Sequence, residues 1–313
     1  MEKKFLAFTI PYYGRWPKWV KLFLDSCSKQ KGIYFFLISD NPPEMELPKN
    51  VYFAKINKSE LAKRIEEKVG IKFSYMHIHK ICDYKPFYGK LFNDLLTNYE
   101  FWGYCDIDLV FGNITSLINQ ERFKEIDIYS PSNRITAGHC TILRNNDLIN
   151  NLCFQIEGYH EKLLEPLTTH LDEISFNECV KVQKKIHNLK VVQALSLEEE
   201  LKKDFAEVGI TMVNSNNYLV DSKQIEYLSY KNGKTYIKKD KEVLYLHFMG
   251  LKRYPFWIFY NRKKTYNEFC FSPIGFLPYN PNNFTKKILI FAGKTIDICR
   301  KNLVKLKKKK ALG

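Results

Sequence analysis

The chain has 313 residues with a formal net charge of +15, and 45% of its residues are hydrophobic and 15% aromatic. This composition excludes a disordered chain and leaves room for one large α/β domain or two smaller ones. No apolar stretch reaches the ~20 residues of a membrane span and no signal peptide is visible. The eight cysteines include no C-x-x-C pair. We therefore expect a protein of the reducing cytoplasm, without a zinc or disulfide framework.

The first seventy residues alternate between apolar runs and helical patterns. Residues 5–10, 33–38 and 51–54 read as strands that are apolar on both faces. A helical pattern starts near Pro17, and a second one covers residues 58–69. Strands of this kind, separated by helices, indicate an α/β fold with a mostly parallel sheet that helices cover.

The pattern continues with a helix over residues 83–96, which Pro86 starts, and a strand over 99–105. Further expected elements are strands at 126–130, 140–143 and 242–249, a helix at 145–159, and a hairpin turn at 231–234. No repeat or linker interrupts this series. We expect one domain over residues 1–270, followed by a tail over 271–313.

Two carboxylates, Asp106 and Asp108, follow the aromatic strand at 99–105. Alternate residues of an extended chain point to the same side, so these carboxylates would repel each other unless a cation lies between them. Mg²⁺ or Mn²⁺ fits such oxygen ligands and accompanies substrate phosphates. The alternative is a solvated turn at a strand end.

Ligands of open α/β sheets bind at the carboxyl ends of the strands, where other candidates also fall. Thr9, Pro11 and Tyr12 could offer backbone groups and an aromatic face to a nucleotide. Asp40 could bind a base or a ribose, although its sequence is also ordinary turn chemistry. His247 could ligate a metal. A diphosphate could bind further along the same strand end, at Gly250, Lys252 and Arg253.

An acidic pair, Asp172 and Glu173, stands at the start of a further predicted helix. These residues either cap the helix or act as a general base. Lys85 and Lys90 precede the Asp-x-Asp strand and could face the diphosphate, or could be solvated. The loop 136–139 could line a sugar pocket, or Gly138 could simply allow a tight turn.

The pattern as a whole resembles GT-A-fold glycosyltransferases. The Asp-Ile-Asp strand end and the late His-Phe-x-Gly-x-(Lys/Arg) are similar to the metal motifs of glycosyltransferase family 8. The segment from Asp83-Tyr-Lys-Pro to Asn113 resembles bacterial capsule and lipopolysaccharide transferases. The resemblance covers roughly residues 1–260 and is sharpest over 83–113.

The resemblance implies transfer of a sugar from a nucleotide-diphosphate donor, a UDP-sugar, to a hydroxyl of a cell-surface glycan or a lipid-linked acceptor. Asp106 would contact the ribose and the metal, while Asp108 and His247 would ligate Mn²⁺ or Mg²⁺. Family 8 places its Lys where this chain has Arg253, with Lys252 before it, so the phosphate-binding cation stays open. The stereochemistry also stays open, because family 8 implies retention and a base at Asp172 or Glu173 implies inversion.

The tail is strongly basic, since residues 284–313 hold ten Lys or Arg and one Asp. Interspersed apolar residues predict an amphipathic helix that lies on the anionic inner face of the cytoplasmic membrane. A solvated terminus and a nucleic-acid contact are the alternatives. Two rival functions remain at this stage: a haloacid-dehalogenase-like phosphatase using Asp106 and Asp108, and a basic nucleic-acid-binding protein. We expect no nucleic acid, because the positive charge gathers in the tail and no binding motif is present.

Overall fold

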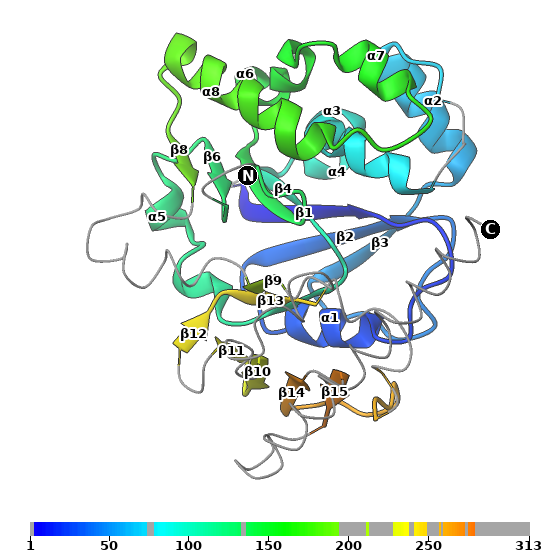
Figure 1. Cartoon of the computed structure of the whole chain (residues 1–313), viewed down its shortest axis with the longest axis vertical. Helices are drawn as coiled ribbons and strands as arrows, with labels where there is room; N and C mark the ends of the chain where they lie inside the picture. The colour runs from blue at the N-terminus through cyan, green and yellow to red at the C-terminus, as the bar shows by residue number, and fades with distance from the viewer. Residues whose placement is uncertain are drawn as a thin grey trace, which may run out of the picture. The chain divides into compact units, whose positions relative to one another are not determined.

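Strand β4 (Tyr99–Cys105) is the middle strand of a seven-stranded sheet with the order β3-β2-β1-β4-β7-β6-β8 (Figure 1). The other strands are β1 (Lys4–Pro11), β2 (Ile33–Ser39), β3 (Val51–Lys55), β6 (Ile128–Ser130), β7 (Cys140–Arg144) and β8 (Val191–Gln193). The computed structural model describes residues 3–73, 78–132, 136–193, 211–212, 228–237, 241–248, 257, 259–272 and 275–278.

The sheet is mostly parallel. Strand β1 pairs in parallel with β2 and β4, β2 with β3, and β6 with β8, whereas β7 runs antiparallel to β4 and β6. The expected mixed α/β architecture is therefore confirmed. Its strands at 5–10, 33–38, 51–54 and 99–105 lie within a residue or so of their predicted ends, because continuous apolar runs mark strands buried on both faces.

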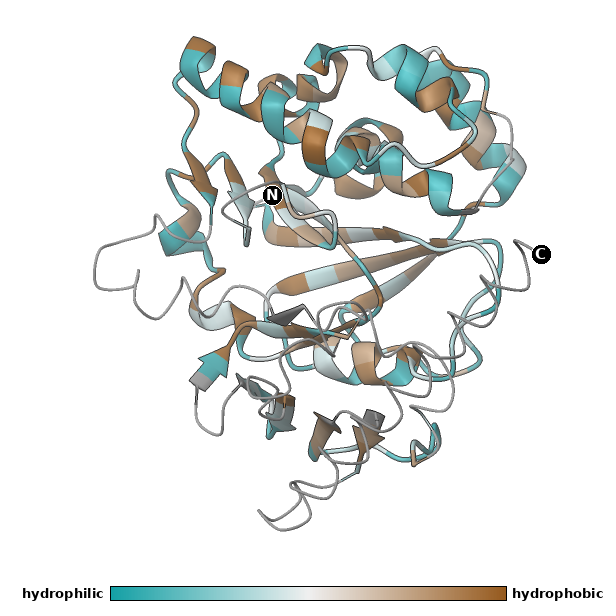
Figure 2. Ribbon diagram, viewed as in Figure 1, coloured by the Kyte–Doolittle hydropathy of each residue, from teal (hydrophilic) through white to brown (hydrophobic). Residues whose placement is uncertain are grey.

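Helices cover one face of this sheet, where apolar residues of both layers form one core (Figures 1 and 2). That core includes Trp102 and Tyr104 of β4 and Leu61 and Ile65 of α2 (Lys58–Val69). Helix α2 matches the prediction, since Asn57 caps its first turn. The other helices on this face are α3 (Tyr88–Leu91), α4 (Asn93–Leu96), α6 (Asp147–Asn150), η3 (Leu152–Gln155), α7 (Tyr159–Leu164) and α8 (Phe176–His187).

The segments before and after β4 fold into shorter helices than predicted. The single helix expected over 83–96 is a 3₁₀ helix η1 (Ile78–Phe87), followed by α3 and α4. Pro86 lies inside η1 and donates no backbone hydrogen bond, which shortens the run. The helix expected over 145–159 consists of α6 and η3, and Gly158 at φ +64 starts α7. Two more short helices follow strand β5 (Leu109–Phe111): η2 (Ile114–Ser116) and α5 (Gln120–Phe123).

The chain divides into two compact units. The first comprises Met1–Pro17, Cys27–Ile107 and Ile114–Gly209, and the second comprises Lys18–Ser26, Asp108–Asn113 and Ile210–Gly313. The seven-stranded sheet belongs to the first unit. The expected division into 1–270 and 271–313 stays a prediction, and so does the basic terminal helix, since residues 279–313 lie outside the described residues.

The second unit contains two small sheets and all but the last residue of helix α1 (Val20–Cys27), which begins three residues after Pro17. One sheet has the order β5-β13-β9 and the other β12-β11-β10-β14-β15. The strands are β5 (Leu109–Phe111), β9 (Thr211–Met212), β10 (Leu228–Lys231), β11 (Lys234–Ile237), β12 (Lys241–Val243), β13 (Tyr245–His247), β14 (Glu268–Ser272) and β15 (Gly275–Leu277). The last predicted strand, 242–249, is thus two strands.

The predicted hairpin at 231–234 is confirmed. Strands β10 and β11 pair antiparallel, with Lys231 opposite Lys234. Asn232 and Gly233 between them have φ of 49° and 84°, as a type I′ turn requires. Among the residues that the structure describes, none of the helices combines the length and the apolar character that a bilayer span requires.

Candidate functional site

The carboxyl ends of β2, β1 and β4 lie side by side at one edge of the large sheet. Pro11 pairs with Ile38 on one side, and Thr9 pairs with Tyr104 on the other. Asp40 directly follows β2, and Asp106 directly follows β4. The candidates at the ends of three parallel strands therefore share one edge, as the fold class predicts.

Lys85 joins Asp106 to a neighbouring loop. Its Nζ donates to Asp106 Oδ1 at 2.8 Å and to the carbonyl oxygen of Gly138 at 2.6 Å. The amide of Asp106 donates to the carbonyl oxygen of His139 at 3.0 Å. Loop 136–139 is thus tied to Asp106 by backbone and by Lys85, and Lys85 is almost fully buried at 6% exposure.

Asp172 approaches the same lysine from a different segment. Its Oδ2 lies 3.7 Å from Lys85 Nζ, and the residue is only 4% exposed. Asp172 and Glu173 are the second and third residues of a π-helical turn, η4 (Leu171–Ser175), which continues into α8. The hydroxyl of Thr136 donates to the carbonyl oxygens of both acids, at 2.7 and 2.9 Å. The structure therefore brings the predicted Lys85, Asp106, Asp172 and the 136–139 loop together.

Burial controls the ionisation of this cluster. Loss of hydration raises the pKa of Asp172 to about 7, and although the Lys85 ammonium opposes the rise, the charges of Glu173 and Asp106 add to it. Burial disfavours the charge of Lys85 as well, but the carboxylates of Asp106 and Asp172 help to hold its pKa well above the usual value. Near neutral pH, Asp172 can therefore accept or donate a proton beside a fixed positive charge.

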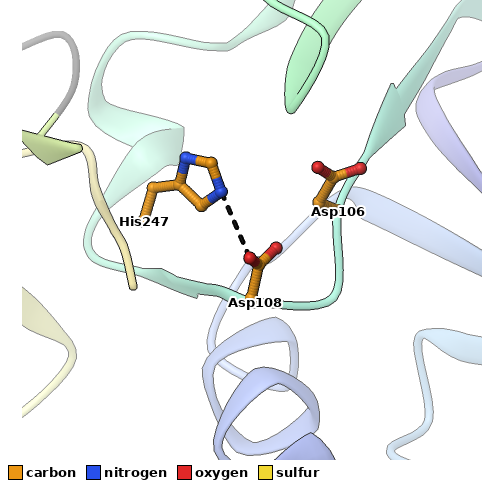
Figure 3. A group of neighbouring side chains, drawn as sticks. All are labelled: Asp106, Asp108 and His247. Carbon is orange, nitrogen blue, oxygen red and sulfur yellow. Dashed lines mark ion pairs between the residues drawn. The ribbon is translucent and has the colours of Figure 1, made fainter. Parts of the chain in front are cut away.

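Asp108 and His247 form a second buried group. Strands β5 and β13 pair antiparallel with Leu109 opposite His247, so the imidazole lies beside the residue that precedes β5. His247 Nε2 is 3.3 Å from Asp108 Oδ2, and the two residues are 3% and 1% exposed (Figure 3). The amide of Phe248 also donates to the carbonyl oxygen of Asp108 at 3.1 Å.

The chain keeps Asp106 two residues from Asp108, and one ligand atom from each of Asp106, Asp108 and His247 lies within 4.8 Å of the others (Figure 3). Two carboxylates and an imidazole are a donor set that suits Mn²⁺ and related first-row ions. Burying the Asp108 carboxylate is costly unless a positive charge compensates it. The residues present therefore fit a divalent metal ion.

The remaining predicted residues have more ordinary surroundings. Thr9 is fully buried, and its hydroxyl donates to the carbonyl oxygen of Gly103 at 3.1 Å. Tyr12 stacks on Trp16 with ring centroids 4.7 Å apart, and Asp40 accepts from the hydroxyl of Ser39 at 3.2 Å. Lys90 is half-buried on α3, and its carbonyl oxygen accepts from Lys68 Nζ at 3.2 Å. Gly250, Lys252 and Arg253 lie outside the described residues.

The sequence did not point to the buried pair of Lys80 and Asp83. Their Nζ–Oδ2 distance is 2.8 Å, and both side chains are at most 5% exposed. The two charges stand three residues apart, next to an aromatic run from Tyr84 to Tyr88. The burial of Lys80 and Asp83 could have been predicted from this signal, two opposite charges next to an aromatic segment.

The structure is weakly similar to two glycosyltransferases. The glycosyltransferase GlyE of Streptococcus pneumoniae aligns over 82% of this chain with 12% identity and a TM-score of 0.37, and this chain spans 57% of the length of GlyE. Mouse xyloside xylosyltransferase 1 aligns over 80% of this chain and 99% of its own length, with 10% identity and a TM-score of 0.42. No curated protein matches the sequence significantly. The model described as "Family of unknown function (DUF6625)" matches residues 8–280, so the chain belongs to that family.

Proposed function

We propose that this protein is a metal-dependent glycosyltransferase that moves a sugar from a nucleotide-diphosphate donor to a hydroxyl of a glycan or lipid-linked acceptor. The observation that carries the proposal is the pairing of a metal-type donor set with a buried acid beside it. Asp106 belongs to the set that fits a divalent ion and also shares Lys85 with Asp172. The motif resemblance over residues 83–113 supports the same reading.

The candidate residues have separate tasks in this proposal. Asp106, Asp108 and His247 hold Mn²⁺ or Mg²⁺, which when bound neutralises charge that develops on the departing diphosphate. Lys85 orients Asp106 through the 2.8 Å ion pair. The donor lies along the edge formed by Pro11, Asp40 and Asp106, with a base or ribose near Tyr12 and Asp40. Gly250, Lys252 and Arg253, which follow β13 in the sequence, would bind the phosphates.

Asp172 is the candidate general base. As a carboxylate it would take the proton of the attacking hydroxyl while that oxygen bonds to the anomeric carbon and the bond from this carbon to the diphosphate breaks. A direct displacement of this kind inverts the anomeric configuration. Retention would instead exclude Asp172 as the base, so the anomeric configuration of the product decides the role of Asp172 and its neighbour Glu173.

The donor and the location of the protein complete the proposal. The resemblance favours a UDP-sugar. The basic segment 284–313 would hold the protein on the anionic inner face of the cytoplasmic membrane, where a lipid-linked acceptor is present. The partners are then a nucleotide sugar, an acceptor glycan and a lipid surface, with no nucleic acid.

Thermal unfolding with UDP, GDP and CDP, each with and without Mn²⁺, tests the proposal. A ligand at about 100 times its dissociation constant stabilises the native state by about 2.7 kcal/mol. We expect a rise in Tm for UDP that requires Mn²⁺ and disappears in Asp108→Ala. The matched control is Asp94→Ala, which removes a half-exposed carboxylate paired with Arg64 and should keep the rise. A folded wild-type protein that responds to no nucleotide would refute the metal-nucleotide site.

A further inference from the structure

Asp83 binds a backbone segment that lies far away in the sequence. Its Oδ2 accepts from the amide of Thr169 at 2.9 Å and from the hydroxyl of the same residue at 3.2 Å. Its Oδ1 accepts from the amide of Leu171 at 3.1 Å. The side chain of Asp83 is fully buried. One carboxylate thus fixes the two residues on either side of His170.

Lys80 completes this buried arrangement, which we call the Asp83 nest (Lys80, Asp83, Thr169 and Leu171). Lys80 Nζ donates to Asp83 Oδ2 at 2.8 Å and to the carbonyl oxygens of Lys162 and Leu167 at 2.6 and 3.0 Å. Both charges therefore have partners. A buried ion pair with so many hydrogen bonds holds its geometry closely, because losing any partner leaves a charge desolvated.

The backbone that the nest holds leads directly into the acidic turn. His170 has φ +55°, a left-handed conformation that is uncommon for a residue with a side chain. Its carbonyl oxygen accepts from the amides of Glu173 and Ile174 at 3.1 and 3.0 Å. Asp172 follows Leu171, so the nest fixes the backbone before Asp172, while the hydroxyl of Thr136 donates to the carbonyl oxygen of Asp172 itself.

We propose that Asp83 is a positioning residue for Asp172, acting through the backbone of Thr169 and Leu171 to hold the Asp172 carboxylate beside Lys85; the proposed catalytic task of Asp172 rests on the function proposed above. Helix η1 supplies both ends of the arrangement, since Asp83 and Lys85 stand two residues apart on it. Through Asp83, η1 thus fixes the backbone that precedes Asp172, and through Lys85 it supplies the positive charge next to the Asp172 carboxylate. Neither Lys80 nor Asp83 is part of the donor or metal set.

A spectroscopic experiment tests the positioning without any substrate. The side-chain carboxyl resonance of Asp172 is recorded in metal-free protein labelled with ¹³C at the aspartate carboxyl groups, and is assigned by its loss in Asp172→Asn. We expect Asp83→Asn to shift this resonance. The matched control is Asp127→Asn, since Asp127, like Asp83, pairs with a basic side chain and accepts from a backbone amide. Its partners are Arg144 Nε at 3.1 Å and the amide of Lys190 at 2.9 Å.

The outcomes of the spectroscopic experiment separate positioning from general loosening. A shift in Asp83→Asn but not in Asp127→Asn supports the proposal. An unchanged resonance in folded Asp83→Asn overturns it, and so does an equal shift in both variants. If Asp83→Asn does not fold, the double variant Lys80→Met with Asp83→Leu replaces it, because swapping a buried ion pair for apolar residues of similar size is often neutral for stability.

Kinetics of UDP-sugar hydrolysis then test the catalytic consequence. We expect Asp83→Asn to lower kcat by about tenfold to a hundredfold with little change in KM, since a misplacement near 1 Å carries such a cost and the donor does not contact the nest. A raised KM with unchanged kcat would contradict a positioning role. If the resonance shifts but no nucleotide binds, the positioning of Asp172 stands and the proposed function fails, so the two failures are distinguishable.

Discussion

Two buried carboxylates adjoin the backbone segment 169–171 and differ sharply in how they are accommodated: Asp83 of η1 accepts hydrogen bonds from it, and Asp172 directly follows it. Asp83 is fully buried and accepts four hydrogen bonds, from Lys80, from the amide and the hydroxyl of Thr169, and from the amide of Leu171. Asp172 is 4% exposed, and its carboxylate lies 3.7 Å from Lys85, beyond hydrogen-bond length. Hydrogen bonds from the protein therefore replace the lost water around the Asp83 carboxylate much more fully than around that of Asp172.

The difference distinguishes a structural acid from a candidate functional one. Hydrogen bonds that replace lost water allow a carboxylate to stay buried at little cost. A carboxylate that is desolvated without such replacement is destabilising, and proteins keep such groups mainly where chemistry uses them. On this reasoning Asp83 stabilises the fold, whereas Asp172 is the better candidate for a functional group.

The largest expected effect is on stability, and it tests the structural half of this comparison. Asp83→Ala leaves Lys80 buried without its counter-charge and two amides without acceptors, so we expect a loss of about 3–5 kcal/mol in the free energy of unfolding. Urea denaturation measures it. Asp94→Ala, at a half-exposed ion pair, should cost no more than about 1 kcal/mol. Similar losses in the two variants would mean that the nest is not a stabilising arrangement.

The next effect concerns Asp172 and depends on pH. Its pKa of about 7 in the folded state exceeds the unfolded value near 3.9, so the native state binds more protons between these pH values and its stability falls as pH rises through that window. Asp172→Asn has no carboxyl group to deprotonate, so it does not lose stability in this way. The free energy of unfolding of the variant, relative to wild type, should therefore increase by about 2–3 kcal/mol from pH 5 to pH 8.

Thermal or urea unfolding of both proteins in EDTA, across that pH range, makes the comparison. Asp83→Asn is unsuitable as a control because it disturbs the same loop, so Asp127→Asn serves instead. If the difference in the free energy of unfolding between Asp172→Asn and wild type stays constant with pH, Asp172 is hydrated normally. The two buried carboxylates, Asp83 and Asp172, would then not differ in the way described.

The smallest effect compares two glycines. A Cβ on Gly138 would lie 2.7 Å from Glu173 Oε1 and 2.8 Å from Asp172 Oδ2, both ends of movable side chains, whereas one on Gly89 would lie 2.6 Å from the buried ring of Trp102. We expect Gly89→Ala to cost about 1–3 kcal/mol and Gly138→Ala less than about 1 kcal/mol. Gly138→Ala should nevertheless shift the Asp172 carboxyl resonance, and Gly89→Ala should not. A shift in Gly89→Ala but not in Gly138→Ala would mean that Asp172 and Glu173 do not lie next to Gly138.

Much of the fold was predictable because its strongest signals are local. Strands β1, β2 and β4 are continuous apolar runs, and α2 has both an apolar stripe and an Asn57 cap. The helical segments 83–96 and 145–159 were misjudged because apolar spacing does not reveal where a helix is interrupted. Pro86 inside η1 and Gly158 at positive φ set those limits through backbone geometry.

The candidate site was predictable as a list of residues but not as an arrangement. Asp106, Asp172 and Lys85 were each candidates, and each had an ordinary alternative. Their meeting depends on how η1 and η4 pack over the sheet, which involves segments about ninety residues apart, such as Asp83 and Leu171 (88 residues). The Asp83 nest was missed for the same reason, since one of its partners is a backbone amide that no sequence pattern distinguishes from any other.

The length of chain between Asp83 and its partners also affects how the protein is made. Thr169 leaves the ribosome 86 residues after Asp83, which at ordinary synthesis rates is a delay of about 4 to 17 s. During that time Lys80 and Asp83 lack their partners in the segment 162–171, and Phe87 lacks its later ring partners, Phe154 and Tyr159. We therefore expect the acidic turn to assemble late in folding, so that weakening the nest accelerates unfolding more than it slows folding.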